Sequence, residues 1–333
     1  MRIGCRRELL WGLPLAACLL FPAYGQESPV SAGIAVKAVR SGANPLITRE
    51  SSSSLGRNIN GPSVVRMPEW AEGRLGKYHM YFAAHRGAHI RLAYSDAIEG
   101  PWKVHEPGTL QLAQAAGFTG HIASPDVHVD DAGRRILMYF HGKRGSGGQF
   151  TALAVSKDGL TFKTDGTVIA PPYLRTWTWN GRVYGVARRG KVEGEPSSGQ
   201  LMTAESAEGP FAVVRDNFIP RMRHAAVLVE GDRLLLFYSR IGDAPERIVM
   251  SVVEMKPDVT AWRCSPAVDV LVPEGVCEGG GYDIAPSKAG SATKVRELRD
   301  PCVFHEEGKS WLFYSIAGES GIAAAELDIA RRR

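Results

Sequence analysis

The chain has 333 residues, of which 44% are hydrophobic and 23% are charged, and its formal net charge at pH 7 is +5. This is the composition of an ordinary globular protein with ample apolar material for a core. Much of the positive excess comes from the two ends of the chain rather than from a basic face or stripe, so no nucleic-acid partner is expected.

The first 25 residues have the three parts of a secretory signal peptide. A basic start is followed by an apolar run over residues 9–21 and by the small-residue ending Ala23-Tyr24-Gly25. The run is too short for a confident transmembrane span. Cleavage after Gly25 is favoured, and the alternative is a bacterial lipoprotein site that leaves a lipid anchor on Cys18. Both alternatives predict an exported mature protein without a transmembrane segment.

Three cysteines remain in the body of the chain. Export permits disulfides, and Cys264 and Cys277 flank a short loop-rich segment, so their pairing is left open. Cys302 stands in an apolar strand and is expected to be a buried thiol. The three cysteines lack the spacing of zinc ligands, and no Asp-rich loop supports a structural calcium ion, so no metal or cofactor is predicted.

The rest of the chain is dominated by a repeat. Residues 26–55 are rich in Ser, Ala and Gly and are predicted to be a leader or an irregular wrap. From residue 56 onward, five units of four short strands follow one another at a spacing of about 45 to 75 residues, as blade repeats do. Their first strands are expected at 61–66, 124–127, 170–175, 223–227 and 298–304. The sequence therefore predicts an all-β, five-bladed β-propeller with four antiparallel strands per blade, forming a single domain over residues 56–330.

The first strand of each propeller blade lines the central channel, so the starts of these strands are expected to converge on one pocket. The clearest position is Asp126, which follows a proline at the entrance of a strand. The expected lining residues are Asn60, His121, Asp126, Tyr173, Arg175, Arg223, His224, Arg299 and Asp300. Buried charges must pair with each other or with a ligand, so this set suits a polyhydroxylated or anionic ligand, although Arg299 and Asp300 can also form a purely structural ion pair.

Three short motifs resemble a known group of enzymes. Ser124-Pro125-Asp126-Val127, Arg299-Asp300-Pro301 and the Ser-Asp-x-x-Glu-Gly-Pro-Trp blade closure resemble those of the five-bladed propeller glycoside hydrolases of families 43, 32, 62 and 117, over about residues 56–328. The resemblance implies acid/base hydrolysis of glycosidic bonds, with Asp126 as the second-blade aspartate that orients the catalytic acid.

Two positions depart from the pattern of these families. Asn60 stands near the place where the resemblance implies an aspartate base, and Tyr173 stands near the place of a glutamate acid. Asp300 is a replacement for the base, and His224 or His121 is a replacement for the acid, because an imidazole held by a carboxylate can donate a proton near neutral pH. Family 117 is similar in having a histidine proposed as acid. Glu297 is a further candidate for the catalytic acid.

Arginines and tryptophans near the strand starts bear on the substrate. Arg175, Arg223 and Arg299 are expected to bind a carboxylate or sulfate group, which makes an acidic sugar one option. Propeller phosphorylases of family 130 are similar in binding phosphate with basic residues, but the expected export counts against phosphorolysis. Trp177 and Trp179 alternate on one strand, where they either stack on a sugar or pack between blades.

The leading prediction is an exported glycoside hydrolase that acts on an oligo- or polysaccharide in the axial pocket. Its first rival is a carbohydrate-binding propeller without catalysis, because the loss of two acidic positions is expected of such a protein. The second rival is a structural or protein-binding propeller. Turnover of a glycan separates the first reading from both rivals.

Overall fold

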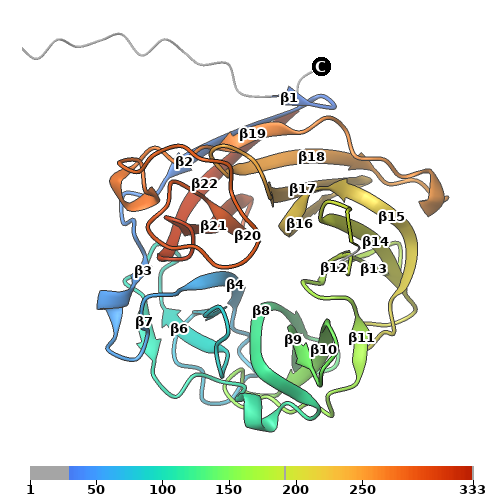
Figure 1. The fold of residues 1–333 in the computed structure, drawn as a ribbon. Helices are drawn as coiled ribbons and strands as arrows, with labels where there is room; N and C mark the ends of the chain where they lie inside the picture. Colours follow the sequence, from blue (N-terminus) through green and yellow to red (C-terminus); the bar gives the residue numbers. More distant parts are fainter. Residues whose placement is uncertain (1–29, 191–192, 332–333) are drawn as a thin grey trace, which may run out of the picture.

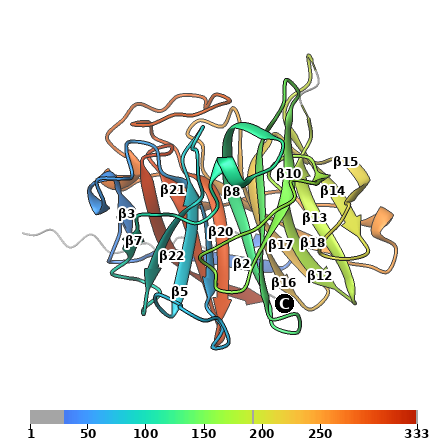
Figure 2. The same cartoon turned by 90° about the horizontal axis from the view of Figure 1, so that it is seen from below.

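A computed structural model describes residues 30–190 and 193–331 of the chain. The signal peptide and the Cys18 anchor suggested by the sequence lie outside these residues. The described strands form five antiparallel sheets arranged around a central axis (Figure 1), and Figure 2 shows the same sheets from the side. This arrangement confirms the predicted five-bladed β-propeller. Among the described residues, no helix is long and apolar enough to cross a membrane.

Each blade begins with its inner strand at the axis and runs outward. Blade 1 comprises β4 (Asn60–Arg66), β5 (Tyr78–Ala83), β6 (Arg91–Ser95) and β7 (Lys103–His105). Blade 2 comprises β8 (Phe118–Asp130), β9 (Arg135–Arg144), β10 (Gln149–Ser156) and β11 (Val168–Ala170). Blade 3 comprises β12 (Arg175–Trp179), β13 (Arg182–Arg188), β14 (Ser198–Ala204) and β15 (Ala212–Pro220). Blade 4 comprises β16 (Met222–Glu230), β17 (Arg233–Arg240), β18 (Ile248–Glu254) and β19 (Val268–Leu271).

Blade 5 closes the ring with strands from both ends of the chain. Its inner three strands are β20 (Arg299–Glu306), β21 (Lys309–Ile316) and β22 (Gly321–Arg331), and its outer strand is β2 (Ile34–Arg40). The pairing of β2 with β22 runs from Ile34 opposite Arg331 to Arg40 opposite Ala325. The short strands β1 (Val30–Ser31) and β3 (Ile47–Thr48) extend the same sheet. The segment expected to be an irregular wrap thus contributes a regular strand to the last blade.

The apolar core consists of five clusters, one between each pair of adjacent blades. Strand β5 shows how one strand serves two of them. Met80 and Phe82 pack toward blade 5, whereas Tyr81 packs toward blade 2. Side chains on a strand alternate between the two faces of the sheet. Both faces of β5 are buried against a neighbouring blade, so both sets of its residues are apolar. This explains the near-continuous hydrophobic runs of the middle strands.

The outer strand of blade 2 does not follow β10 directly. Residues 158–161 instead form a turn in which the Asp158 carboxylate accepts hydrogen bonds from the backbone N–H groups of Leu160 and Thr161, each at 2.8 Å. The strand follows later, as β11. An aspartate that bonds to the backbone two and three residues ahead favours such a turn over a strand.

Candidate functional site

A cavity of about 220 Å³ opens at the end of the axis where the inner strands begin. We call it the axial cavity. All five blades contribute to its lining, which consists of Asn60, His85, Arg86, His121, Ala123, Ser124, His141, Gln149, Tyr173, Arg188, Arg223, His224, Gly290 and Glu319. The predicted site residues that meet here are Asn60, His121, Tyr173, Arg223 and His224.

A two-residue bulge with a proline shapes the start of three inner strands. It occurs at Gly61-Pro62 in β4, Ser124-Pro125 in β8 and Asp300-Pro301 in β20, where the register of each strand with its neighbour shifts. The residue before each proline has a positive φ, of 63°, 47° and 49° respectively. These three positions are therefore equivalent in the fold.

The bulges change the place of Asp126. The sequence placed Asp126 and Asp300 in the same pocket. In the structure, the counterpart of Asp300 is Ser124, and Asp126 lies two residues beyond it. The Asp126 side chain instead lines a cavity of about 380 Å³ formed by later residues of the five inner strands. Its Oδ2 lies 2.9 Å from His128 Nε2 and accepts a hydrogen bond from the Thr176 N–H at 3.0 Å. Asp126 is thus absent from the axial cavity lining.

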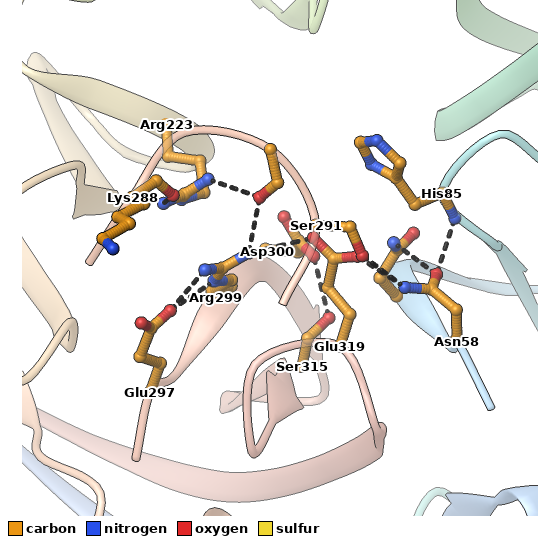
Figure 3. Close-up of polar contacts among 12 residues, drawn as sticks. Asn58, His85, Arg223, Lys288, Ser291, Glu297, Arg299, Asp300, Ser315 and Glu319 are labelled. Carbon is orange, nitrogen blue, oxygen red and sulfur yellow. Dashed lines mark hydrogen bonds and ion pairs between the residues drawn. The ribbon is translucent and has the colours of Figure 1, made fainter. Parts of the chain in front are cut away.

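His224 and Asp300 form a buried pair beneath the axial cavity. His224 Nδ1 contacts Asp300 Oδ1, and the side chain of His224 comes from the corresponding irregularity in β16. Ser315 Oγ donates a hydrogen bond of 2.9 Å to Asp300 Oδ2 (Figure 3). Asp300 is 2% exposed and His224 is 8% exposed. Within the described part of the chain, His224 Nε2 has no hydrogen-bond partner.

Burial and charge set the protonation of this pair. Burial is the largest influence on His224 and lowers its pKa, although Asp300 acts in the opposite direction. For Asp300, burial acts to raise the pKa, but the attraction and hydrogen bonding of His224, together with Arg299 and Ser315, outweigh it and hold the pKa below its ordinary value. An ionised Asp300 beside a neutral His224 fixes the imidazole with Nδ1 toward the carboxylate, which leaves Nε2 as the second ring nitrogen.

Three rings form one wall of the cavity. The ring centroid of Tyr173 lies 4.0 Å from that of His141 and 4.4 Å from that of His224. His141 is 2% exposed, and its Nδ1 has no hydrogen-bond partner among the described residues. Burial holds the pKa of His141 well below its ordinary value, so this imidazole is neutral. The wall therefore combines ring surface with polar edges, as carbohydrate sites do.

Two of the arginines predicted to bind an anion are committed to buried carboxylates. Arg223 binds Glu246 through two hydrogen bonds of 2.7 and 2.8 Å, and Arg299 binds Glu297 and Glu319. They also donate to backbone carbonyls of the loop after β19, Arg223 to that of Lys288 at 2.6 Å and Arg299 to that of Gly290 at 3.0 Å. Figure 3 shows Arg223 and Arg299 beside this loop, which their bonds to the two carbonyls hold next to the cavity.

Arg175 is also occupied inside the fold. Its Nε donates to the Ala225 carbonyl at 3.1 Å, and one Nη donates to the Ser124 carbonyl at 3.2 Å. The side chain thereby links the inner strands of blades 2, 3 and 4. A buried guanidinium needs acceptors for its N–H groups. Backbone carbonyls supply them here, so these N–H groups are not available for the anion that the sequence predicted.

Two other arginines, Arg86 and Arg188, line the axial cavity and were not predicted from the sequence. Within the described residues, neither Arg86 nor Arg188 lies within ion-pair distance of a carboxylate. The Arg188 guanidinium lies over the Tyr173 ring, with Cζ 5.6 Å from the centroid, and its Nε donates to Ser197 Oγ at 2.9 Å. Arg188 ends β13, the strand next to the inner strand, and no local sequence pattern marks it as a lining residue.

The remaining carboxylates leave little room for a paired-carboxylate mechanism. Glu297 is buried against Arg299, and burial, with repulsion from Glu246, raises its pKa. Glu319 is the carboxylate in the lining of the cavity, but Arg299, Asn58 and Ser291 all donate hydrogen bonds to it (Figure 3). Glycosidases with two carboxylates keep both free to act on the substrate.

Trp177 belongs to the core rather than to a sugar platform. It is 6% exposed and stacks between blades 3 and 4, with its ring centroid 5.9 Å from that of Tyr184 and 6.5 Å from that of Trp262. Trp179 packs in the same cluster. Both indole rings are therefore committed to packing between blades.

The three cysteines in the described residues are free thiols. Cys264 and Cys277 belong to different core clusters, so the disulfide left open by the sequence is not formed. Cys302 is partly buried on an inner strand, and burial raises its pKa to about 12. In residues 30–190 and 193–331, no group of three or more His, Cys, Asp or Glu side chains is arranged to hold a metal ion.

The fold is that of the family-43 glycoside hydrolases. A thermostable family-43 glycoside hydrolase superposes with a TM-score of 0.60 at 15% identity, covering 86% of this chain and 91% of that chain. The GH43_1 enzyme from Xanthomonas citri gives 0.59 at 13% identity, covering 88% and 91%. An alpha-L-arabinofuranosidase from Lactobacillus brevis gives 0.57 at 12% identity, covering 85% and 92%. The chain is thus a five-bladed propeller of the architecture that the sequence motifs had suggested.

The sequence places the chain in a narrower group. It is 35% identical over 303 residues to "Uncharacterized protein R118" of Acanthamoeba polyphaga mimivirus. The alignment covers 81% of this chain and 83% of that protein. The chain belongs to the family of that protein. No family model matches the sequence.

Proposed function

We propose that this protein is an exported glycoside hydrolase that cleaves an oligo- or polysaccharide in the axial cavity. The observation that carries the proposal is the His224–Asp300 pair, because His224 lines a cavity of rings and polar groups and its Nε2 has no hydrogen-bond partner among the described residues. The architecture shared with family-43 glycoside hydrolases supports the same class of substrate.

In the proposed reaction, His224 is the base. Its Nε2 accepts a proton from water as the water oxygen bonds to the anomeric carbon, and Asp300 stabilises the resulting imidazolium. The glycosidic C–O bond breaks at the same time, and a protonated His121, a half-buried imidazole in the cavity lining, donates a proton to the leaving oxygen. Burial and the neighbouring charges of His85 and Arg86 lower the pKa of His121, so this acid favours turnover at acidic pH. Glu319 accepts hydrogen bonds from Asn58, Ser291 and Arg299, which hold both of its oxygens, so we infer direct attack by water with inversion rather than a Glu319 nucleophile.

The charge of the cavity favours an acidic sugar. Arg86 and Arg188 add two positive charges to the lining, whereas Glu319 adds one negative charge that Arg299, shared with Glu297, offsets in part. A guanidinium with free N–H groups binds a carboxylate or sulfate group in a bidentate manner. We therefore assign a uronate or a sulfated sugar as the substrate class, and the anion-binding role to these two arginines.

Activity on defined oligosaccharides tests the proposal. Wild-type protein is incubated with uronate oligomers, sulfated galactan oligomers and neutral xylo-oligomers, and the products are separated by anion-exchange chromatography. Hydrolysis is expected for an acidic series and is expected to be lost in His224→Ala. Asp126→Asn is the matched control, because it alters a partly buried aspartate at the other cavity, and it is expected to retain activity.

A carbohydrate-binding propeller without catalysis is the second candidate. The three hydrogen bonds to Glu319 favour it, since both oxygens of the one carboxylate in the described lining of the axial cavity are then engaged. It predicts that an acidic oligosaccharide binds to the wild type and is recovered uncleaved at every pH. Binding without cleavage would establish this candidate, and cleavage would exclude it.

A further inference from the structure

A groove between blades 2 and 3 adjoins the axial cavity. Its volume is about 380 Å³, and its lining consists of Gly148, Gln149, Phe150, Pro171, Pro172, Tyr173, Arg188, Arg189 and Gly190. Gln149, Tyr173 and Arg188 line both the groove and the axial cavity. The two spaces therefore meet at a junction of one amide, one ring and one guanidinium.

The groove has a firm apolar floor. The backbone carbonyl of Pro171 accepts a hydrogen bond from Thr151 Oγ1 at 2.6 Å, and that of Pro172 accepts one from the Arg188 N–H at 2.9 Å. These bonds tie the two prolines to blade 2 and blade 3 at once. The neighbouring Gly148 has no side chain, and a Cβ added there would lie 3.9 Å from the ring of Phe150. A glycine at this position thus leaves that side of the ring without a covering side chain.

The junction offers hydrogen-bond donors as well. Nε of Arg188 is used by Ser197, and no other hydrogen bond from its side chain is made within the described part of the chain. Its two Nη groups therefore remain available above the Tyr173 ring. An apolar floor combined with a few fixed donors is the usual composition of a carbohydrate subsite.

We propose that this groove is a second sugar subsite, which binds the residue next to the one held in the axial cavity. The ring of that residue lies against Phe150 and the two prolines, and its acidic substituent points to Arg188 at the junction. The substrate then runs outward between blades 2 and 3 and contains at least two sugar residues. This inference rests on the proposed function, because it takes the axial cavity to be the site of the first sugar.

Affinity as a function of chain length tests the subsite. Calorimetric titration compares one-residue and four-residue members of the uronate, sulfated galactan and neutral xylose series. For a series that binds, Phe150→Ala is expected to lower affinity for the four-residue probe about tenfold, through loss of ring stacking, and to leave the one-residue affinity unchanged. Phe150→Tyr keeps the ring face and is expected to behave as the wild type. A thermal scan of each variant checks that it is folded.

The outcomes separate the subsite from the function. Equal affinity of wild-type protein for the short and long probes would overturn the subsite and leave the proposed function standing. An equal effect of Phe150→Ala on both probes, or no effect on either, would do the same. If the wild type binds no probe of any series, the proposed function fails and the subsite fails with it.

Discussion

Replacing Asp300 with asparagine removes one negative charge beneath the axial cavity at almost constant side-chain size. The carboxylate it replaces contacts His224 Nδ1 and accepts the Ser315 hydroxyl at 2.9 Å. An amide oxygen can still accept one of these bonds, so the fold is expected to survive. The imidazolium that forms during the proposed reaction, however, loses the carboxylate that stabilises it.

The expected size of this effect follows from the role of the pair. A positioned acid or base typically contributes about 10²–10⁴ in rate, and an aspartate behind a catalytic histidine contributes roughly 10⁴ in the serine-protease triad. We therefore expect kcat to fall by about 10²–10⁴ in Asp300→Asn, with KM little changed. Because His224 is neutral in the resting protein, the substitution weakens hydrogen bonds to a buried carboxylate, and the expected loss in unfolding free energy is about 1.5–3 kcal/mol.

The pH profile gives an independent reading of the same variant. The base must be neutral, so activity is expected to rise with pH through the pKa of His224. Asp300 raises that pKa against the lowering effect of burial. Its replacement is therefore expected to move the rising limb of kcat/KM to lower pH, as measured on a cleaved acidic oligosaccharide. Activity within twofold of the wild type, or a shift of the limb to higher pH, would refute the reasoning.

Further predictions concern substrate charge, the core, one bulge and the closing strand. Arg188→Gln is expected to weaken binding of acidic oligosaccharides at least tenfold, as about 1.4 kcal/mol or more from a lost charge-assisted bond implies, and to spare neutral ones in the same titration. Trp177→Ala is expected to lower the unfolding free energy by about 3–5 kcal/mol in urea titrations, without changing sugar affinity in the folded protein. Gly61→Ala forces a side chain into a φ of 63° and is expected to cost about 1–2 kcal/mol by the same urea assay. Deleting residues 30–41 exposes the edge of β22, and aggregation on size-exclusion chromatography is the expected result.

The propeller could be predicted because its signal is repeated and local. Each middle strand is buried on both faces, so each unit carries a recognisable apolar run followed by a turn. The outer strand of blade 5 lacked such a signal. Its seven residues, Ile34–Arg40, pair with a strand almost a whole chain away, and that distant partner is invisible to a local pattern.

The site was predicted in part, and the errors have physical causes. His224 and Asp300 were both expected near the axis, and the structure brings them into contact. Asp126 was assigned to the same pocket because the bulge at Ser124-Pro125 was not anticipated. Without the bulge, the predicted position of each residue of β8 along the axis is wrong by two residues. Each bulge has a proline, at position 62, 125 or 301. Aligning the three inner strands on this proline would have matched Ser124, rather than Asp126, with Asp300.

The charges of the arginines show a second limit. Which arginine is free depends on which carboxylates fold against it, and that is a property of tertiary structure. Arg223 and Arg299 stand at strand starts but are neutralised by glutamates from other segments. Arg188 stands at the end of a second strand, where the sequence gives no sign that it reaches the axis.

The most direct test of the account is a crystal structure of Asp300→Asn bound to an acidic oligosaccharide that the wild type cleaves. The account predicts a sugar residue in the axial cavity, with a water molecule about 3 Å from His224 Nε2 on the side of the anomeric carbon. A sugar bound instead in the cavity beside Asp126, with the axial cavity free of carbohydrate, would contradict it.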